Sequence, residues 1–159
     1  MFRLVAGAII VAALCAGCAD NKAYQEYIDF EDRQWLLSDT ARFEFTIEDT
    51  TSVYNLFCNV RNSTDFPYAR VFVNFTMADT SGMPLHKALL TEFLFDAKSG
   101  EPFGKSGLGD LYDHQIPVLK NFKFQGKGPY RVSMQQFNRT DTLTGIISVG
   151  LAIERTVQP

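Results

Sequence analysis

Two carboxylates and one imidazole lie close together between residues 104 and 114, and these are the side chains most suited to chemistry. Asp110, Asp113 and His114 are all metal-ligand types, because carboxylate oxygen and imidazole nitrogen bind Zn²⁺ and harder cations. A protein metal site needs further ligands to complete its coordination shell. No second cluster supplies them, since His86 stands alone in a predicted turn. The sequence therefore predicts no metal and no cofactor.

Catalytic motifs are incomplete in this chain. The stretch Gly100–Ser106 resembles a phosphate-binding loop, but it is one residue short of the G-x-x-x-x-G-K-[ST] spacing and contains a proline. No serine has a nucleophile-elbow context, and Glu44 and Glu48 fall on the polar side of a predicted strand. We therefore expect no enzyme and no small-molecule substrate. A hydrolase with an unrecognised site is the competing hypothesis.

The segment Gly104–His114 interrupts the pattern of the rest of the chain. Its three glycines within six residues disfavour a regular strand or helix, so we expect it to cross from one sheet to another. Apolar and charged side chains are mixed in it, as in loops that bind proteins. The candidate partner-binding loop residues are Leu108, Asp110, Leu111, Tyr112 and Asp113.

The first eighteen residues have the layout of an export signal. Met1–Arg3 carries one positive charge, and Leu4–Leu14 is an apolar run shorter than the about 20 residues that span a bilayer. The small residues directly before Cys18 are similar to the lipobox of bacterial lipoproteins, in which the cysteine is acylated and becomes the new N-terminus. We predict a lipoprotein signal peptide at 1–17 and lipid attachment at Cys18. An ordinary secretory signal that contains cysteines is the alternative.

Charge and cysteine content limit the partners. The chain has 15 Lys and Arg against 18 Asp and Glu, a net charge of −3, and it shows no basic stripe. We therefore expect no nucleic-acid partner. Cys15 leaves with the signal and Cys18 takes lipid, so Cys58 has no disulfide partner. Cys58 alternates in phase with Leu56 and Val60, which predicts a buried side chain.

From residue 41 onward, apolar and polar residues alternate along most of the chain. A period of two is typical of half-buried strands, and turn residues separate the segments. The expected strands cover 41–47, 54–60, 71–77, 89–95, 118–124, 130–134 and 147–153. The expected core includes Phe45, Leu56, Val73, Phe93, Val132 and Leu151.

This pattern predicts an all-β fold. We expect an antiparallel β-sandwich of about seven to eight strands, immunoglobulin-like or jelly-roll-like, with a small β-barrel as the alternative. We place a single β-sandwich domain at 40–159. Residues 18–39 are expected to form a lipid-anchored tether and an edge segment.

Several short motifs follow one another along the mature chain. They are Cys18, Tyr24–Tyr27, Trp35, Phe43–Phe45, Tyr54–Leu56 leading to Val60–Asn62, Asp65–Tyr68, Gly107–Leu111 and Gly150–Glu154. In this order they resemble the gliding-motility lipoprotein H family, the GldH-type bacterial envelope lipoproteins. The resemblance covers essentially the whole mature chain.

The resemblance implies a cell-envelope protein, lipid-anchored to the outer membrane and facing the periplasm. Family members are needed for surface gliding in motile species, where they accompany secretion and adhesin machinery, and no enzymatic activity comes with the family. It implies a non-enzymatic component of, or accessory to, a gliding-motility or secretion apparatus that acts by protein–protein interaction with envelope proteins. The alternative is a carbohydrate-binding lipoprotein of the cell envelope, because exposed aromatic side chains on such a fold can stack on sugars.

Substitution of Cys18 by Ala tests the lipid anchor. The variant lacks the acylated sulfur, so we expect it to lose labelling by fatty acid and to remain uncleaved or become soluble. Metabolic labelling and membrane fractionation of wild type and variant measure both effects. Persistent labelling of the variant, or a soluble wild type, would refute the assignment.

Overall fold

The computed structural model describes residues 21–156, so the predicted signal peptide at 1–17 and the lipid-attachment residue Cys18 lie outside the described part. Within these residues the strands, in chain order, are β1 (Lys22–Asp29), β2 (Gln34–Leu36), β3 (Thr40–Ile47), β4 (Tyr54–Ser63), β5 (Arg70–Asp79), β6 (Pro84–Phe93), β7 (Lys105–Ser106), β8 (Leu111–Phe122), β9 (Gly128–Gln136), β10 (Thr142–Thr144) and β11 (Ile146–Arg155). A single 3-10 turn, η1 (Glu31–Arg33), joins β1 to β2. No helix in the described residues is long and apolar enough to cross a membrane.

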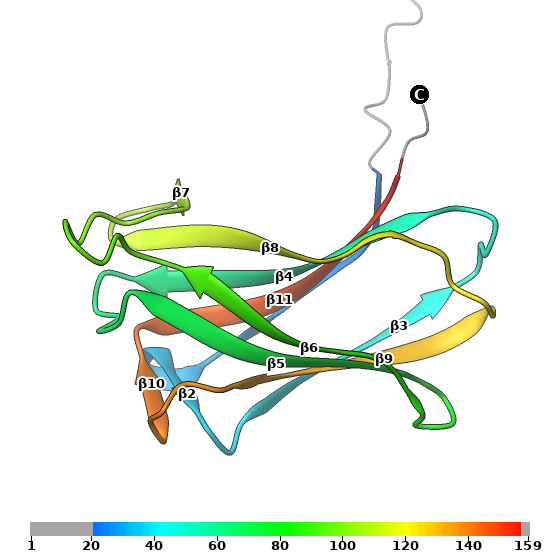
Figure 1. Ribbon diagram of the computed structural model, residues 1–159, viewed down its shortest axis with the longest axis horizontal. Coiled ribbons are helices and arrows are strands. Elements are labelled where there is room, and N and C mark those ends of the chain that lie inside the picture. Colours follow the sequence, from blue (N-terminus) through cyan, green and yellow to red (C-terminus); the bar gives the residue numbers. More distant parts are fainter. Residues whose placement is uncertain (1–20, 157–159) are drawn as a thin grey trace, which may run out of the picture.

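The strands form two main antiparallel sheets that face each other (Figure 1). One sheet has five strands in the order β1-β11-β4-β8-β7, and the other has four in the order β3-β9-β5-β6. The short strands β2 and β10 pair as a separate ribbon at one end. The predicted antiparallel β-sandwich is therefore confirmed, and the sheets are not closed into the alternative barrel.

The strand order is that of a jelly roll. If the eight long strands are numbered 1 to 8 along the chain, their orders in the two sheets read 1-8-3-6 and 2-7-4-5. The pairs β1–β11, β3–β9, β4–β8 and β5–β6 are all antiparallel, as expected when a long two-stranded ribbon wraps into two Greek keys. This order selects the jelly-roll form of sandwich over the immunoglobulin-like form.

The N-terminal part of the domain starts earlier than the sequence indicated. Lys22–Asp29, expected as part of a tether and edge segment at 18–39, forms β1 and pairs with β11 along its length. Trp35 is fully buried, stacks on Phe30 at 5.0 Å and donates a hydrogen bond from Nε1 to the Asp39 carbonyl oxygen at 2.9 Å. The sandwich therefore includes residues before the expected boundary at 40.

The space between the sheets is filled by aliphatic and aromatic side chains. Of the predicted core residues, five are buried as expected: Phe45, Leu56, Val73, Val132 and Leu151. Phe45 stacks on Tyr130 at 5.8 Å, and the edge of Phe124 meets Phe45 at 6.0 Å. Offset and edge-on ring contacts of this kind add to the burial energy. Cys58 is also fully buried, and burial raises the pKa of its thiol to about 12.

The prediction that Phe93 is buried was wrong. Phe93 is 45% exposed, whereas Leu90 and Leu94 face the core. The chain has apolar pairs at 89–90 and at 93–94, so alternation alone allows either phase. The true phase leaves Leu89 and Phe93 on the outer surface of the four-stranded sheet.

The segment Gly104–His114 crosses between the sheets, as expected, because β6 belongs to the four-stranded sheet and β7 and β8 belong to the five-stranded one. It is less irregular than the glycines suggested. Lys105–Ser106 forms the short strand β7, and β8 begins at Leu111. Gly104 has a φ of +86° and packs against His114, so a Cβ there would lie 2.8 Å from the imidazole Nε2 atom.

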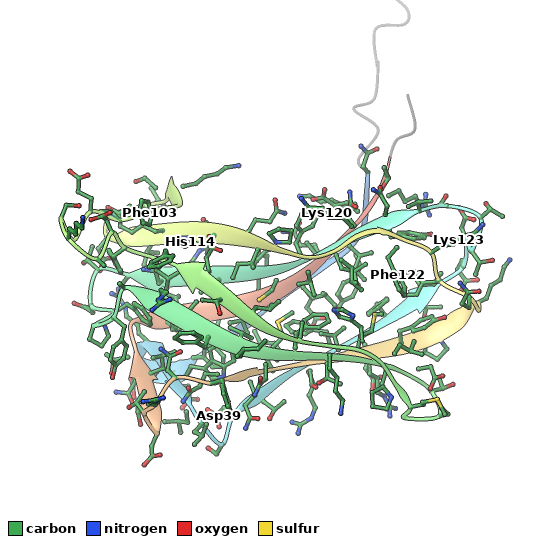
Figure 2. All side chains as sticks on the ribbon, viewed as in Figure 1. Asp39, Phe103, His114, Lys120, Phe122 and Lys123 are labelled. Atoms are coloured by element: carbon green, nitrogen blue, oxygen red, sulfur yellow. The ribbon has the colours of Figure 1, made fainter. Side chains whose placement is uncertain are left out.

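The sandwich has two distinct ends. We call the end that contains Asn21 the near end. The Arg155 amide donates to the Asn21 carbonyl oxygen, and Tyr54 is opposite both Arg155 and Phe122, so these residues lie at the same end. The turns after β3, β5 and β8 also lie there. The opposite end, which we call the far end, carries the segments 30–33, 64–69, 94–110 and 137–145. Figure 2 shows Phe103 at the far end and Lys123 at the near end.

A pair of phenylalanine substitutions tests the core assignment. Phe45→Ala should lower the free energy of unfolding by about 3–5 kcal/mol, because it removes a buried ring. Phe93→Ala, the matched control on the outer surface, should cost less than about 1 kcal/mol. Denaturant unfolding of both variants measures the difference, and equal losses would contradict the strand phases.

Candidate functional site

The candidate partner-binding loop is divided between a loop and a strand. Leu108 lies at the tip and is 90% exposed, the most exposed large apolar side chain of the described residues. Asp110 follows in the turn, while Leu111, Tyr112 and Asp113 form the start of β8. Of the five candidate residues, only Leu108 and Asp110 therefore lie in the loop, and the other three belong to the strand.

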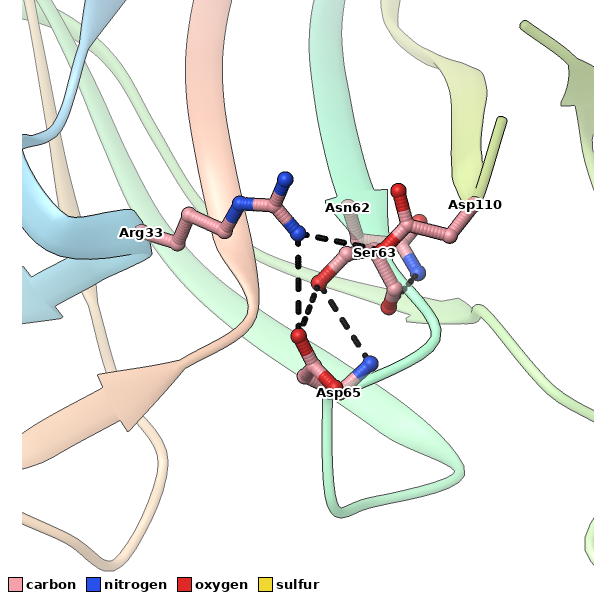
Figure 3. Close-up of polar contacts among 5 residues, drawn as sticks. All are labelled: Arg33, Asn62, Ser63, Asp65 and Asp110. Atoms are coloured by element: carbon pink, nitrogen blue, oxygen red, sulfur yellow. Dashed lines mark hydrogen bonds and ion pairs between the residues drawn. The ribbon is translucent and has the colours of Figure 1, made fainter. Parts of the chain in front are cut away.

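Asp110 belongs to a cluster of polar contacts that joins three segments of the far end (Figure 3). Arg33 Nη1 lies 3.0 Å from Asp110 Oδ2 and 3.6 Å from Asp65 Oδ2. The Thr64 amide also donates to the Asp110 carbonyl oxygen at 3.2 Å. Each exposed ion pair of this kind contributes about 0–1 kcal/mol, so the cluster holds the turns in place without dominating stability.

Asp113 is held on the outer face of the five-stranded sheet. Its carboxylate accepts hydrogen bonds from Arg61 Nε at 2.7 Å and from Nη2 at 3.2 Å. The hydrogen bond to Asp113 raises the pKa of the Arg61 guanidinium, because it favours the charged form. Asp113 is therefore paired with Arg61 across β4 and β8, whereas Asp110 is paired with Arg33.

His114 points the opposite way, into the sandwich between β8 and β6 (Figure 2). It is 6% exposed, and its Nε2 atom has no hydrogen-bond partner among residues 21–156. Burial lowers the pKa of His114, and the charge of Asp113 opposes this only in part. Asp110, Asp113 and His114 thus face three different surroundings and do not converge on a common point.

The far end and the adjoining outer surface of β5 and β6 carry an apolar patch that sequence reasoning missed. We define the apolar patch by the residues Tyr68, Arg70, Phe72, Leu89, Phe93, Phe137 and Arg139, most of which line a hollow of about 540 Å³. The guanidinium carbon of Arg70 lies 4.9 Å from the centre of the Phe93 ring and 5.6 Å from that of Phe72. Cation–π contacts at this range hold the arginine over the rings.

Two cations and no carboxylate line this hollow. The Arg139 side chain forms no ion pair or hydrogen bond within the described part of the chain, and the Arg70 guanidinium has only its ring contacts. Aromatic and arginine side chains together are the composition that protein interfaces favour. The signal in the sequence was the apolar pair at 93–94, since one member of such a pair in an edge strand must face outward.

A second surface lies on the outer face of the five-stranded sheet. The ring of Tyr27 lies across Gly150, where a Cβ would come within 2.6 Å of Tyr27 Cδ1. Gln25 Nε2 and Asn59 Nδ2 donate to the Tyr27 hydroxyl at 3.0 and 3.1 Å. These side chains line a groove of about 520 Å³ together with Gln115 and others. A partly exposed ring beside amides is the arrangement that the carbohydrate-binding alternative requires.

Comparisons with known proteins agree on a single family. The family model described as GldH lipoprotein matches residues 22–153. The gliding motility lipoprotein GldH homolog of Christiangramia forsetii is 30% identical over 155 residues, covering 93% of both chains. Gliding motility lipoprotein GldH of Flavobacterium johnsoniae is 27% identical over 154 residues, covering 92% of this chain and 93% of that protein.

Among solved structures, the VP2 subviral particle of infectious bursal disease virus is similar with a TM-score of 0.40 and 12% identity. The match covers 91% of this chain, and the chain spans only 37% of that structure.

Acidification tests the buried state of His114. Since burial lowers the pKa of His114 below its ordinary 6.5, the unfolded chain binds this proton more readily than the folded domain. The stability that neutral His114 contributes is therefore complete above pH 6.5. It is lost as the pH falls from 6.5 through the lower pKa of the folded domain. The unfolding free energy of the wild type should therefore drop relative to His114→Gln between pH 7 and pH 5. Thermal or denaturant unfolding at each pH measures this, and parallel pH curves would contradict it.

Proposed function

Because the chain belongs to the GldH lipoprotein family, we propose that it is a lipid-anchored component of, or accessory to, a gliding-motility or secretion apparatus, and that it acts by binding envelope proteins. The motility association is supported by the names of the two relatives, which match over nearly their full length. The interaction mechanism is supported by the apolar patch. No catalytic step is part of the proposal.

The proposed anchor is the acylated Cys18 in the outer membrane, with the domain in the periplasm. Asn21 follows Cys18 by three residues, a span of at most roughly 11 Å. The near end of the sandwich would thus stay close to the lipid surface. The far end is separated from Asn21 by the length of β1 and its neighbours, roughly 30 Å for a ten-residue strand. A partner could therefore reach the far end while the anchor is inserted.

The single observation that carries the proposal is the apolar patch with its two arginines. An exposed group of aromatic rings next to cations lacking carboxylate partners favours a partner segment that combines apolar side chains with Asp or Glu. The tip residue Leu108 and the exposed Phe103 extend the apolar surface of the far end. We assign the patch as the docking surface and the candidate partner-binding loop as its border.

The carbohydrate-binding alternative rests on Tyr27 and its amide neighbours. One face of the ring is covered by Gly150, and its hydroxyl already accepts two hydrogen bonds. A sugar ring could stack only on the remaining exposed face. This surface carries one aromatic platform, whereas the apolar patch carries several rings and two cations, so protein binding is the better-supported function.

Site-specific photo-crosslinking in intact cells tests the docking surface. A photoreactive residue at Phe137, on the patch, should capture a partner, and the captured peptide should be apolar and net acidic. The control position is Thr46, exposed on the outer face of the same sheet at the near end. Arg139→Glu should reduce capture at Phe137 by about tenfold, the equivalent of about 1.4 kcal/mol.

Three outcomes would contradict the assignment. They are equal capture at Phe137 and Thr46, a basic captured peptide, and capture unaffected by Arg139→Glu. Loss of capture on addition of an oligosaccharide, reproduced by Tyr27→Ala, would instead favour the carbohydrate-binding alternative.

A further inference from the structure

Strand β6 is an edge of the four-stranded sheet, and its outward side chains differ from those of β3, the opposite edge of the same sheet. Edge strands are normally protected by outward charges, because their free backbone groups can pair with another chain. The opposite edge, β3, follows this rule by placing Arg42 and Glu44 on its outer face. On β6 Lys87 is the one outward charge, and the outward residues Leu85, Leu89 and Phe93 are 44%, 52% and 45% exposed.

The backbone of β6 offers a regular row of unpaired groups. The Phe72 amide donates to Asn138 Oδ1 at 3.0 Å and its carbonyl accepts from Phe137, so the Phe72 backbone points toward β9. The flanking residues of β5 therefore point toward β6, and their partners there include Leu90 and Glu92. The alternate residues of β6, Lys87, Leu89, Thr91 and Phe93, direct their N–H and C=O groups to the free edge.

The sequence of this edge is self-complementary. If a second β6 runs antiparallel with the two-fold axis at Leu89, then Leu89 faces its own copy and Leu85 faces Phe93. On the inner side, the same register places Glu92 opposite His86 and Leu90 opposite Ala88. An axis at residue 88 would place His86 opposite Leu90. An axis at residue 90 would place Lys87 opposite Phe93. Only the register centred on Leu89 matches apolar with apolar and acid with imidazole.

His86 and Glu92, which face each other in this register, both lack polar partners within the described part of a single chain. The His86 Nε2 atom is buried without a hydrogen-bond partner among the described residues. Glu92 is half-buried and forms no ion pair there, and burial raises the pKa of its carboxyl group. A buried polar group without a partner is costly, so a partner supplied by a second chain would stabilise both groups.

We propose that a second copy of this chain pairs with β6 through the antiparallel register centred on Leu89, forming a two-fold dimer with a continuous eight-stranded sheet. The sheet would contain four strands from each copy. The dimer does not depend on the docking function of the apolar patch. The outer faces of Arg70, Phe137 and Arg139 remain open in it, because edge pairing uses the backbone of β6.

The arrangement is compatible with a shared membrane. The two-fold axis that relates two strands of one sheet can run perpendicular to that sheet. In Figure 1 the start of β1 and the end of β11 rise together on the side of the five-stranded sheet away from the four-stranded one. Rotation about this axis leaves both chain starts on the same side. Both copies can therefore be anchored to one lipid surface.

Cysteine crosslinking of the full-length protein in its membrane tests the register. Leu89→Cys should form an intermolecular disulfide on mild oxidation, because Cα atoms about 5.5 Å apart in such a pair fall within the disulfide range. Lys87→Cys and Thr91→Cys alone should not, since each residue lies about 13 Å along the strand from its own copy. The double variant carrying both cysteines should crosslink. Cys58 is buried, which keeps the background low.

A matched pair of charge variants measures the same contact at equilibrium. Thr91 faces Lys87 of the second copy twice in the dimer, so Thr91→Lys should weaken association and Thr91→Glu should strengthen it. Each of the two pairs changes from repulsive to attractive between the variants, at about 0.2–1 kcal/mol for either state, which predicts dissociation constants at least about fourfold apart. Sedimentation of the lipidated protein in detergent gives these constants.

Any of three results would overturn the dimer. The first is a monomeric wild type by sedimentation at the concentration where Leu89→Cys was tested. The second is equal crosslinking at residues 87, 89 and 91, and the third is equal dissociation constants for Thr91→Lys and Thr91→Glu. Capture at Phe137 in the photo-crosslinking experiment is read separately, so failure of the dimer and failure of the docking surface are distinguishable.

Discussion

The fold depends on pairing between strands that are far apart in the chain. β1 is bonded only to β11, and β3 is bonded only to β9, so both N-terminal strands rely on C-terminal partners. Only β5 and β6 form a local hairpin among the four wrapped pairs. Close approach is part of this constraint, because Gly150 of β11 leaves room for the Tyr27 ring of β1. Most of the loop-closure entropy must therefore be overcome before the sheets are complete, which is typical of β-sandwiches.

The alternation of apolar and polar residues identified the strands that have one solvent-exposed and one buried face. β3 and β5 are such strands, and their buried residues Phe45 and Val73 were predicted correctly. Edge strands were harder, because both of their faces are partly exposed. β1 reads as polar for this reason, and the apolar pairs of β6 left its phase undecided. The contact of Arg33 with Asp110 joins residues 77 apart, so no local pattern could reveal it.

The two sheets present different chemistry to their surroundings. The outer face of the five-stranded sheet is polar, with Tyr27 and the Arg61–Asp113 pair satisfied internally. The four-stranded sheet is polar near β3 and becomes apolar toward β6, where Arg70 lies over aromatic rings. The exposed apolar side chains are therefore concentrated on one side of the molecule. The polar clusters of the far end, including Arg33 and Asp110, keep the turns beside that side in place.

The attachment of β1 to the edge of the five-stranded sheet also determines how the domain transmits force. β1 runs from Asn21 at the near end toward the far end and is paired with β11 through most of its eight residues. A pull on the N-terminus, resisted by a load at the far end, acts along β1 and loads its hydrogen bonds in shear. In shear these bonds must fail together, whereas a peeling force would break them singly. β1 is thus placed to resist a pull that is applied to the N-terminus along the length of the strand.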